Sequence, residues 1–178
     1  PAAWSVSDYA AWTLEALRYL GIRCPHVVAH SFGGRVAVKC LSQGDVFDRA
    51  VLAGCAGIVP RRTFSYHVRV KTYRAVRKIA PRFAEKRFGS SEYRTLSPVM
   101  RESYKKIVNE DLREDAAKIS RPVLFVNGTK DTAVPPASVR VYLSCVKGSG
   151  VFWLEGCGHF AFLDNPLAFN AATEEFFQ

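Results

Sequence analysis

Three residues that lie far apart along the chain have the types that nucleophilic catalysis needs: Ser31, Asp131 and His159. A serine hydroxyl is a weak nucleophile at neutral pH, so it requires a base to accept its proton and an acid to orient that base. Ser31 interrupts VVAHSFGGRVAV, in which an apolar run passes through a serine and two glycines into helix-forming residues. A sharp turn of this kind holds the hydroxyl out above a sheet edge. We therefore predict Ser31 as nucleophile, His159 as base and Asp131 as acid.

The residues after Ser31 predict how a developing negative charge is stabilised. The amide of Phe32 lies at the expected start of a helix, where it points toward an oxyanion formed on Ser31. Gly33 is expected to let the backbone pass closely where a side chain would collide. The alternative interpretation is that Ser31 only caps the helix that follows it.

Asp131 and His159 each follow a predicted strand, Asp131 after the turn NGTK and His159 after the small-residue loop EGCG. Parallel strands bring their carboxyl ends to one edge of a sheet, where α/β proteins assemble their sites. Two other carboxylates compete for the acid role. Glu155 lies too close to His159 in the sequence, and Asp164, in LDNP, is explained as a cap for the final helix.

Short apolar runs alternate with helical stretches along most of the chain. The runs are typical of parallel strands covered on both faces. The predicted strands are residues 26–29, 49–53, 122–126 and 150–154, and the predicted helices are residues 8–20, 35–43, 137–146 and 165–177. Such alternation predicts an α/β fold with a mostly parallel sheet and right-handed crossovers.

The first predicted helix has recognisable ends. Ser7 is expected to cap it, and Gly21 supplies the stop. Its mostly apolar stripe is expected to contain Trp12, Leu14, Leu17 and Leu20.

One segment, residues 60–120, carries the whole charge imbalance of a chain whose net charge is +9. It contains 16 lysines and arginines against 7 acidic residues, and it lacks buried-strand runs. We predict an inserted helical cap over a core formed by residues 1–59 and 121–178. Residues 64–80 are expected to form an amphipathic helix with its charges in water. The alternative is weak contact with a membrane surface or an anionic substrate. Nucleic-acid binding is not expected, because no RNP, KH or zinc-finger pattern is present.

Composition narrows the remaining classes of protein. The five cysteines are scattered without a CxxC pair, which favours reduced thiols in a cytoplasmic protein over disulfides or a zinc ribbon. Cys157 and His159 have a ligand-like spacing, but no other cluster completes a tetrahedral site, so we predict no metal and no cofactor. No apolar run of about 18 residues exists to span a bilayer. The other histidines, interpreted as structural or solvated, are His26, His30 and His67.

Three stretches together resemble the α/β-hydrolase superfamily, in particular its lidded, esterase-like serine hydrolases: HVVAHSFGG, RPVLFVNGTKDTAVP and LEGCGHFAFLDNP. The order Ser, Asp, His is the one that this family uses. Ala29 replaces the first glycine of the nucleophile-elbow motif GxSxG. The resemblance implies a catalytic triad, an acyl-enzyme and a small or medium ester, thioester or related carbonyl substrate. Carbon–carbon bond hydrolases and cofactor-free perhydrolases share the triad and remain alternatives.

The chain departs from the family at its start. Family members begin with several strands that precede the first helix here, and a loop among them usually donates the second oxyanion amide. The Ser31 strand is central in the family, so without those strands residues 27–29 are expected to form an unpaired edge. We interpret the chain as the C-terminal two-thirds or so of such a protein. A second chain or a missing N-terminal segment is then expected to complete the sheet. The alternative is a catalytically silent fragment that acts as an interaction module.

Overall fold

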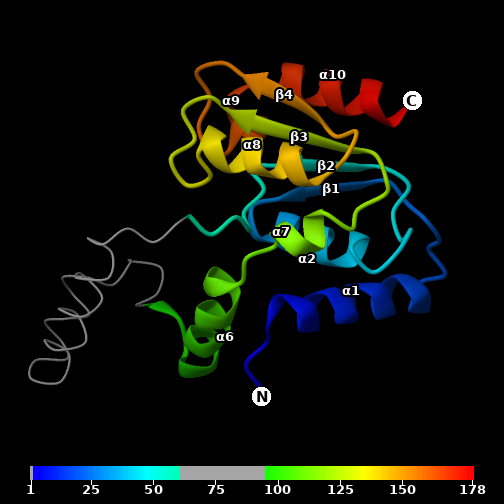
Figure 1. The fold of residues 1–178 in the computed structure, drawn as a ribbon, viewed down its shortest axis with the longest axis vertical. Helices are drawn as coiled ribbons and strands as arrows, with labels where there is room; N and C mark the ends of the chain where they lie inside the picture. The colour runs from blue at the N-terminus through cyan, green and yellow to red at the C-terminus, as the bar shows by residue number, and fades with distance from the viewer. Residues whose placement is uncertain (1, 61–94) are drawn as a thin grey trace, which may run out of the picture.

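The predicted α/β architecture is confirmed by a computed structural model, which describes residues 2–60 and 95–178. Four parallel strands form one sheet in the order β1-β2-β3-β4 (Figure 1). The strands are β1 (Val27–His30), β2 (Ala50–Ala53), β3 (Val123–Gly128) and β4 (Gly150–Leu154). Each strand reaches its neighbour through a crossover, so all four carboxyl ends lie at the same edge of the sheet.

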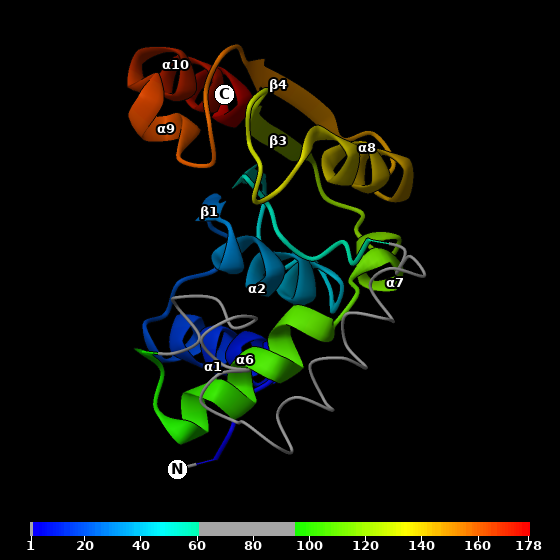
Figure 2. The ribbon, with the colours of Figure 1, turned by 90° about the vertical axis from the view of Figure 1, so that its left-hand side faces the viewer.

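Helices cover both faces of this sheet (Figure 2). The described helices are α1 (Val6–Tyr19), α2 (Phe32–Leu41), α6 (Pro98–Asn109), α7 (Arg113–Ala116), α8 (Pro136–Cys145), α9 (Ala161–Asp164) and α10 (Pro166–Phe177). On one face lie α2, α7 and α8, with α1 packed against α2, and on the other lie α9 and α10.

Side chains alternate along the strands between two apolar clusters, as the pleat of a strand requires. Leu52 and Phe125 face the larger cluster, which α2, α7 and α8 complete. Val51 and Val126 face the smaller cluster, which includes Phe169 of α10. The sheet therefore holds the loops at its carboxyl edge between two packed layers.

The start of α1 differs from the prediction. Ser5, not Ser7, is the cap: its hydroxyl accepts from the amide of Asp8, and the Asp8 carboxylate accepts from the amide of Ser5. This reciprocal pair satisfies two amides at once. Gly21 follows the helix in the left-handed region, as expected.

The apolar stripe of α1 was also predicted incorrectly in part. Trp12 and Leu20 are 59% and 64% exposed, whereas the side chains that reach the core are Val6, Ala10, Leu14 and Leu17. These four residues are spaced by four, four and three positions, so they share one face of the helix.

Residues 61–94 lie outside the described part of the chain, and with them the predicted helix over residues 64–80 and His67. The division into a core and a cap over residues 60–120 therefore stays a prediction. At the end of that range, Leu112, Ala116 and Ile119 pack into the larger cluster. Thus α7 is packed on the sheet layer, between α2 and α8.

Within the described sheet, β1 is an edge strand that pairs only with β2. The Val28 side chain is 50% exposed, although valine is typical of buried strands. This arrangement is the unpaired edge that the sequence predicted for residues 27–29.

All five cysteines are free thiols. Among the described helices, none has both the length and the apolar character needed to cross a membrane.

Candidate active site

The three residues singled out in the sequence meet at the carboxyl edge of the sheet. His159 lies between the other two: its Nε2 is 3.0 Å from the Ser31 hydroxyl and its Nδ1 is 2.9 Å from the Asp131 carboxylate. Ser31 follows β1, Asp131 follows β3 and His159 follows β4. An imidazole held in this way can accept a proton from a hydroxyl while a carboxylate orients the ring and stabilises its charge.

Ser31 has an unusual backbone conformation, with φ 50° and ψ −108°. A non-glycine residue rarely adopts a positive φ, and such strain is typical of functional turns. The backbone of Ser31 is fixed on both sides, because its amide donates to Ala53 O at 3.0 Å and its carbonyl accepts from Gly34 N at 3.1 Å. Its hydroxyl makes no capping hydrogen bond to α2. The interpretation of Ser31 as a simple helix cap is therefore wrong.

The close approach that was predicted for Gly33 occurs instead one residue later. A Cβ on Gly33 would meet only the Ala29 Cβ, at an ordinary 3.8 Å. A Cβ on Gly34 would lie 2.7 Å from Cys55 Sγ, which is too close. The second glycine is thus the one that lets α2 pack against the chain that leaves β2.

Asp131 is almost completely buried, and its two oxygens have different partners. Oδ1 accepts from the amides of Ala133 and Val134, both at 2.8 Å, while Oδ2 faces His159. The side chain of Asn127 donates to Val134 O and so braces the same turn. Since two amides fix one oxygen, the other is held in one orientation toward the imidazole.

The loop that carries His159 is held by contacts that the sequence did not predict. Asp164 accepts from the amide of Gly158 at 2.7 Å, and His30 Nε2 lies 3.0 Å from His159 O. Asp164 was expected to cap the final helix. That cap is Asn165, whose side chain accepts from Ala168 N and which precedes Pro166 at the first position of α10.

A glycine allows the acid loop and the base loop to touch. A Cβ on Gly128, at the end of β3, would overlap the carbonyl oxygens of Cys157 and Gly158. The competing acid Glu155 is directed elsewhere, since its Oε1 accepts from the Thr129 hydroxyl. Neither Glu155 nor Asp164 contacts the imidazole of His159 among the described contacts.

Ser31 opens into a cavity of about 340 Å³. Its walls come mainly from α1, α2 and α6 and are mostly apolar; they include Tyr9, Phe32, Leu96, Met100, Tyr104 and Ile107. A cavity of this size suits a small organic group. Among residues 2–60 and 95–178, no group of three or more His, Cys, Asp or Glu side chains is placed to hold a metal ion.

Comparison with known proteins shows the family to which the chain belongs. Residues 1–172 match the model of the alpha/beta hydrolase family. The chain belongs to this family. The fold has solved counterparts at low identity, including an esterase from Exiguobacterium antarcticum (22% identical, TM-score 0.73, covering 98% of this chain and 74% of that one). Another is a meta-cleavage product hydrolase from Pseudomonas fluorescens IP01 (21% identical, TM-score 0.69, covering 98% of this chain and 72% of that one).

A curated relative is longer than this α/β-hydrolase chain. An uncharacterised protein of Mycobacterium tuberculosis is 24% identical over 98% of this chain. The matched region is 62% of the relative, so the chain spans less than two-thirds of that protein's length.

The residue predicted to stabilise an oxyanion is placed consistently with that role. Phe32 is the first residue of α2. The first amides of an α-helix have no acceptor within the helix, so they are available to an anion at its N-terminus. The Phe32 ring lies edge-on to Tyr9, with 5.0 Å between centroids, at the wall of the Ser31 cavity.

Proposed function

We propose that the protein is a serine hydrolase that cleaves an ester, thioester or related carbonyl bond through an acyl-enzyme. Ser31 is the nucleophile, His159 the general base and Asp131 the acid that orients it. The observation that carries this proposal is the pair of hydrogen bonds that His159 makes, one to the Ser31 hydroxyl and one to the buried Asp131 carboxylate.

The proposed reaction has two stages. Ser31 Oγ attacks the substrate carbonyl while His159 Nε2 takes its proton, and Asp131 stabilises the imidazolium. The Phe32 amide donates to the oxyanion of the tetrahedral intermediate. His159 then returns the proton to the leaving group, which leaves an acyl group on Ser31. In the second stage His159 deprotonates a water molecule, which attacks the acyl carbonyl. The bond from the acyl carbon to Ser31 Oγ then breaks, and His159 returns the proton to that oxygen.

The cap and the substrate class follow from the walls of the cavity. We propose that residues 60–120 cover the site, because Met100 and Tyr104 of α6 line the cavity beside Ser31. The apolar lining favours a hydrophobic acyl or alcohol group. The chemistry requires no cofactor. The five free thiols favour a reducing compartment such as the cytoplasm.

A fluorophosphonate probe tests the proposal, since it forms a bond from phosphorus to an activated serine oxygen and releases fluoride. We expect the wild-type protein to be labelled at Ser31 and Ser31→Ala, with an unchanged far-ultraviolet circular dichroism spectrum, to remain unlabelled. Labelling of folded Ser31→Ala would assign the reactivity to another residue.

The exposed edge of β1 supports a second candidate, a catalytically silent interaction module. In the described sheet, residues 27–30 pair with β2 on one side and with no strand on the other. We propose that a further strand, from a preceding segment of a longer chain or from a second chain, pairs with this edge. If the fluorophosphonate fails to label a well-folded wild-type sample, the result favours the silent module over the hydrolase.

A further inference from the structure

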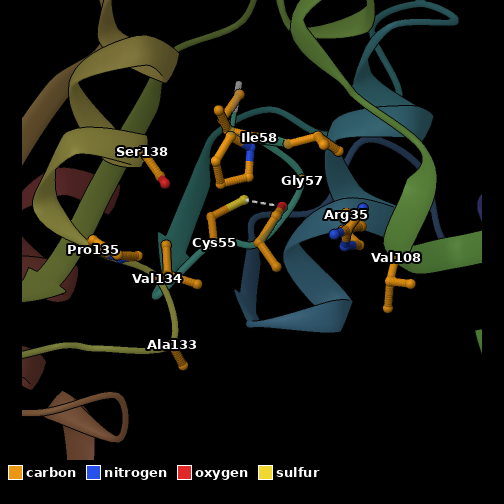
Figure 3. A pocket seen from close by; sticks show the side chains of 12 residues that line it. Arg35, Cys55, Gly57, Ile58, Val108, Ala133, Val134, Pro135 and Ser138 are labelled. Atoms are coloured by element: carbon orange, nitrogen blue, oxygen red, sulfur yellow. Dashed lines mark hydrogen bonds between the residues drawn. The ribbon is translucent and has the colours of Figure 1, made fainter. Parts of the chain in front are cut away.

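A second cavity adjoins the one that contains Ser31. It has a volume of about 210 Å³ and shares three lining residues with the first: Arg35, Ala56 and Val108 (Figure 3). Its opposite wall comes from the turn after β3, where Val134 also donates to the Asp131 carboxylate. The two cavities are therefore neighbours, and Ser31 lines the larger one.

Arg35 is the charged residue common to both cavities, and it is only 8% exposed. Its Nη1 donates to two carbonyl oxygens at the end of α6, Ile107 O at 2.8 Å and Glu110 O at 3.0 Å. Among the described residues, nothing accepts a hydrogen bond from its Nε or Nη2. Neither atom is among the fully enclosed polar atoms that lack a partner. Arg35 lines both cavities, so a group bound in either cavity can accept from these two donors.

The carboxylates nearest to Arg35 are engaged with other groups. Glu110 accepts from Lys39 Nζ at 2.9 Å, and Asp111 accepts from Val59 N and from Arg113. Within the described chain, no carboxylate oxygen lies within ion-pair distance of Arg35. Burial lowers the pKa of its guanidinium, but an arginine keeps its proton in proteins. Arg35 is thus a buried cation that has no anionic partner among residues 2–60 and 95–178.

We propose that Arg35 recognises a carboxylate, or an anionic group of similar shape, on the substrate of this site. This inference rests on the proposed hydrolase function. Arg35 is the fourth residue of α2, which begins directly after Ser31, and both residues line the larger cavity. The anionic group is therefore a few bonds from the scissile carbonyl, while the apolar part of the substrate fills the larger cavity. The planar guanidinium matches a carboxylate with two parallel hydrogen bonds.

Boronic acids test this without turnover, because boron accepts the Ser31 oxygen to form one B–O bond while the hydroxyl proton moves to His159. The probes are 3-carboxyphenylboronic acid and its neutral analogue 3-carbamoylphenylboronic acid, with dissociation constants measured by titration calorimetry at pH 7.5. We expect the wild-type protein to bind the carboxylate form about tenfold or more tightly, in line with a charge-assisted hydrogen bond.

Two variants distinguish recognition of the carboxylate by Arg35 from an effect of the protein's net charge. Arg35→Met should bring the ratio of the two constants close to one, whereas Lys118→Met, which removes a positive charge from the exposed turn after α7, should keep the wild-type ratio. Because Arg35 also holds α6, Arg35→Lys provides a second test and should show an intermediate ratio.

Different experimental results would overturn this inference and the proposed hydrolase function. Equal binding of both probes to the wild-type protein, or a carboxylate preference that survives in folded Arg35→Met, overturns the role of Arg35 alone. If neither probe binds and the fluorophosphonate does not label Ser31, the hydrolase function fails and the inference fails with it.

Discussion

Replacing Asp131 with asparagine isolates the contribution of one charge to the proposed mechanism. The asparagine oxygen can still accept the two amides of Ala133 and Val134 that now bind Oδ1. Its NH₂ group then faces His159 Nδ1, which must become an acceptor. The proton of a neutral imidazole moves to Nε2 as a result, and Nε2 can no longer take the proton of Ser31.

The size of the effect follows from the same contact. Two unit charges about 4 Å apart attract by ~4 kcal/mol at an effective dielectric constant of about 20. The Asp131 side chain is fully buried and that of His159 is 19% exposed, so water screens the imidazolium only in part. Since about 1.4 kcal/mol corresponds to a tenfold change in rate, loss of this stabilisation together with the wrong tautomer predicts a decrease in kcat/KM of roughly 10³-fold or more.

Hydrolysis of 4-nitrophenyl butyrate measures this effect, with Glu155→Gln as the matched control. Glu155 is a carboxylate of the same site region, but it accepts from Thr129 and does not contact the imidazole. We expect Glu155→Gln to stay within about twofold of wild type. A folded Asp131→Asn protein that keeps more than a tenth of the wild-type kcat/KM would refute the assignment of Asp131.

Other predictions concern the free energy of unfolding, the reactivity of a buried thiol and association through the edge strand. Ser5→Ala should lower the free energy of unfolding by ~1 kcal/mol in urea denaturation, whereas Ser7→Ala should leave it nearly unchanged. Gly128→Ala should cost about 1–3 kcal/mol in the same assay, because its methyl group overlaps two carbonyl oxygens. Burial raises the pKa of Cys55 to about 12, so its thiol should resist iodoacetamide at pH 8 in native protein and react after denaturation. Val28→Lys should reduce concentration-dependent association measured by light scattering, because the residue is half exposed on the edge strand.

The parts of the fold that the sequence predicts best are those set by local pattern. An apolar run that leads into Ser31, followed closely by Gly33 and Gly34, predicts a sharp turn with an exposed hydroxyl, because few other structures suit that order of residues. Asp131 and His159 could be placed beside Ser31 because carboxyl ends of parallel strands share an edge. The hydrogen bonds of His159 match that expectation.

The errors arise where the outcome depends on contacts between distant segments. Ser5 and Ser7 are both good caps, and Asp8, three residues after Ser5, was an available signal of a capping box that the prediction did not use. The close contact of Gly34 depends on where the chain runs after β2, which the local sequence does not contain. The sequence likewise offered no reason to single out Arg35, because its burial depends on contacts with the distant end of α6.

The edge of β1 and the oxyanion site are linked by position. The proposed triad comes entirely from residues after β1, β3 and β4, so strands of the described sheet position all three of its members. We propose one oxyanion donor, the Phe32 amide, and the second donor in this family comes from a loop beside the nucleophile strand. A strand that pairs with β1 would bring such a loop close to Ser31. Since an oxyanion donor acts mainly in the transition state, supplying it should raise kcat by about 10²–10³ and leave KM nearly unchanged. A strand whose addition lowers only KM would therefore act on substrate binding, not on the oxyanion.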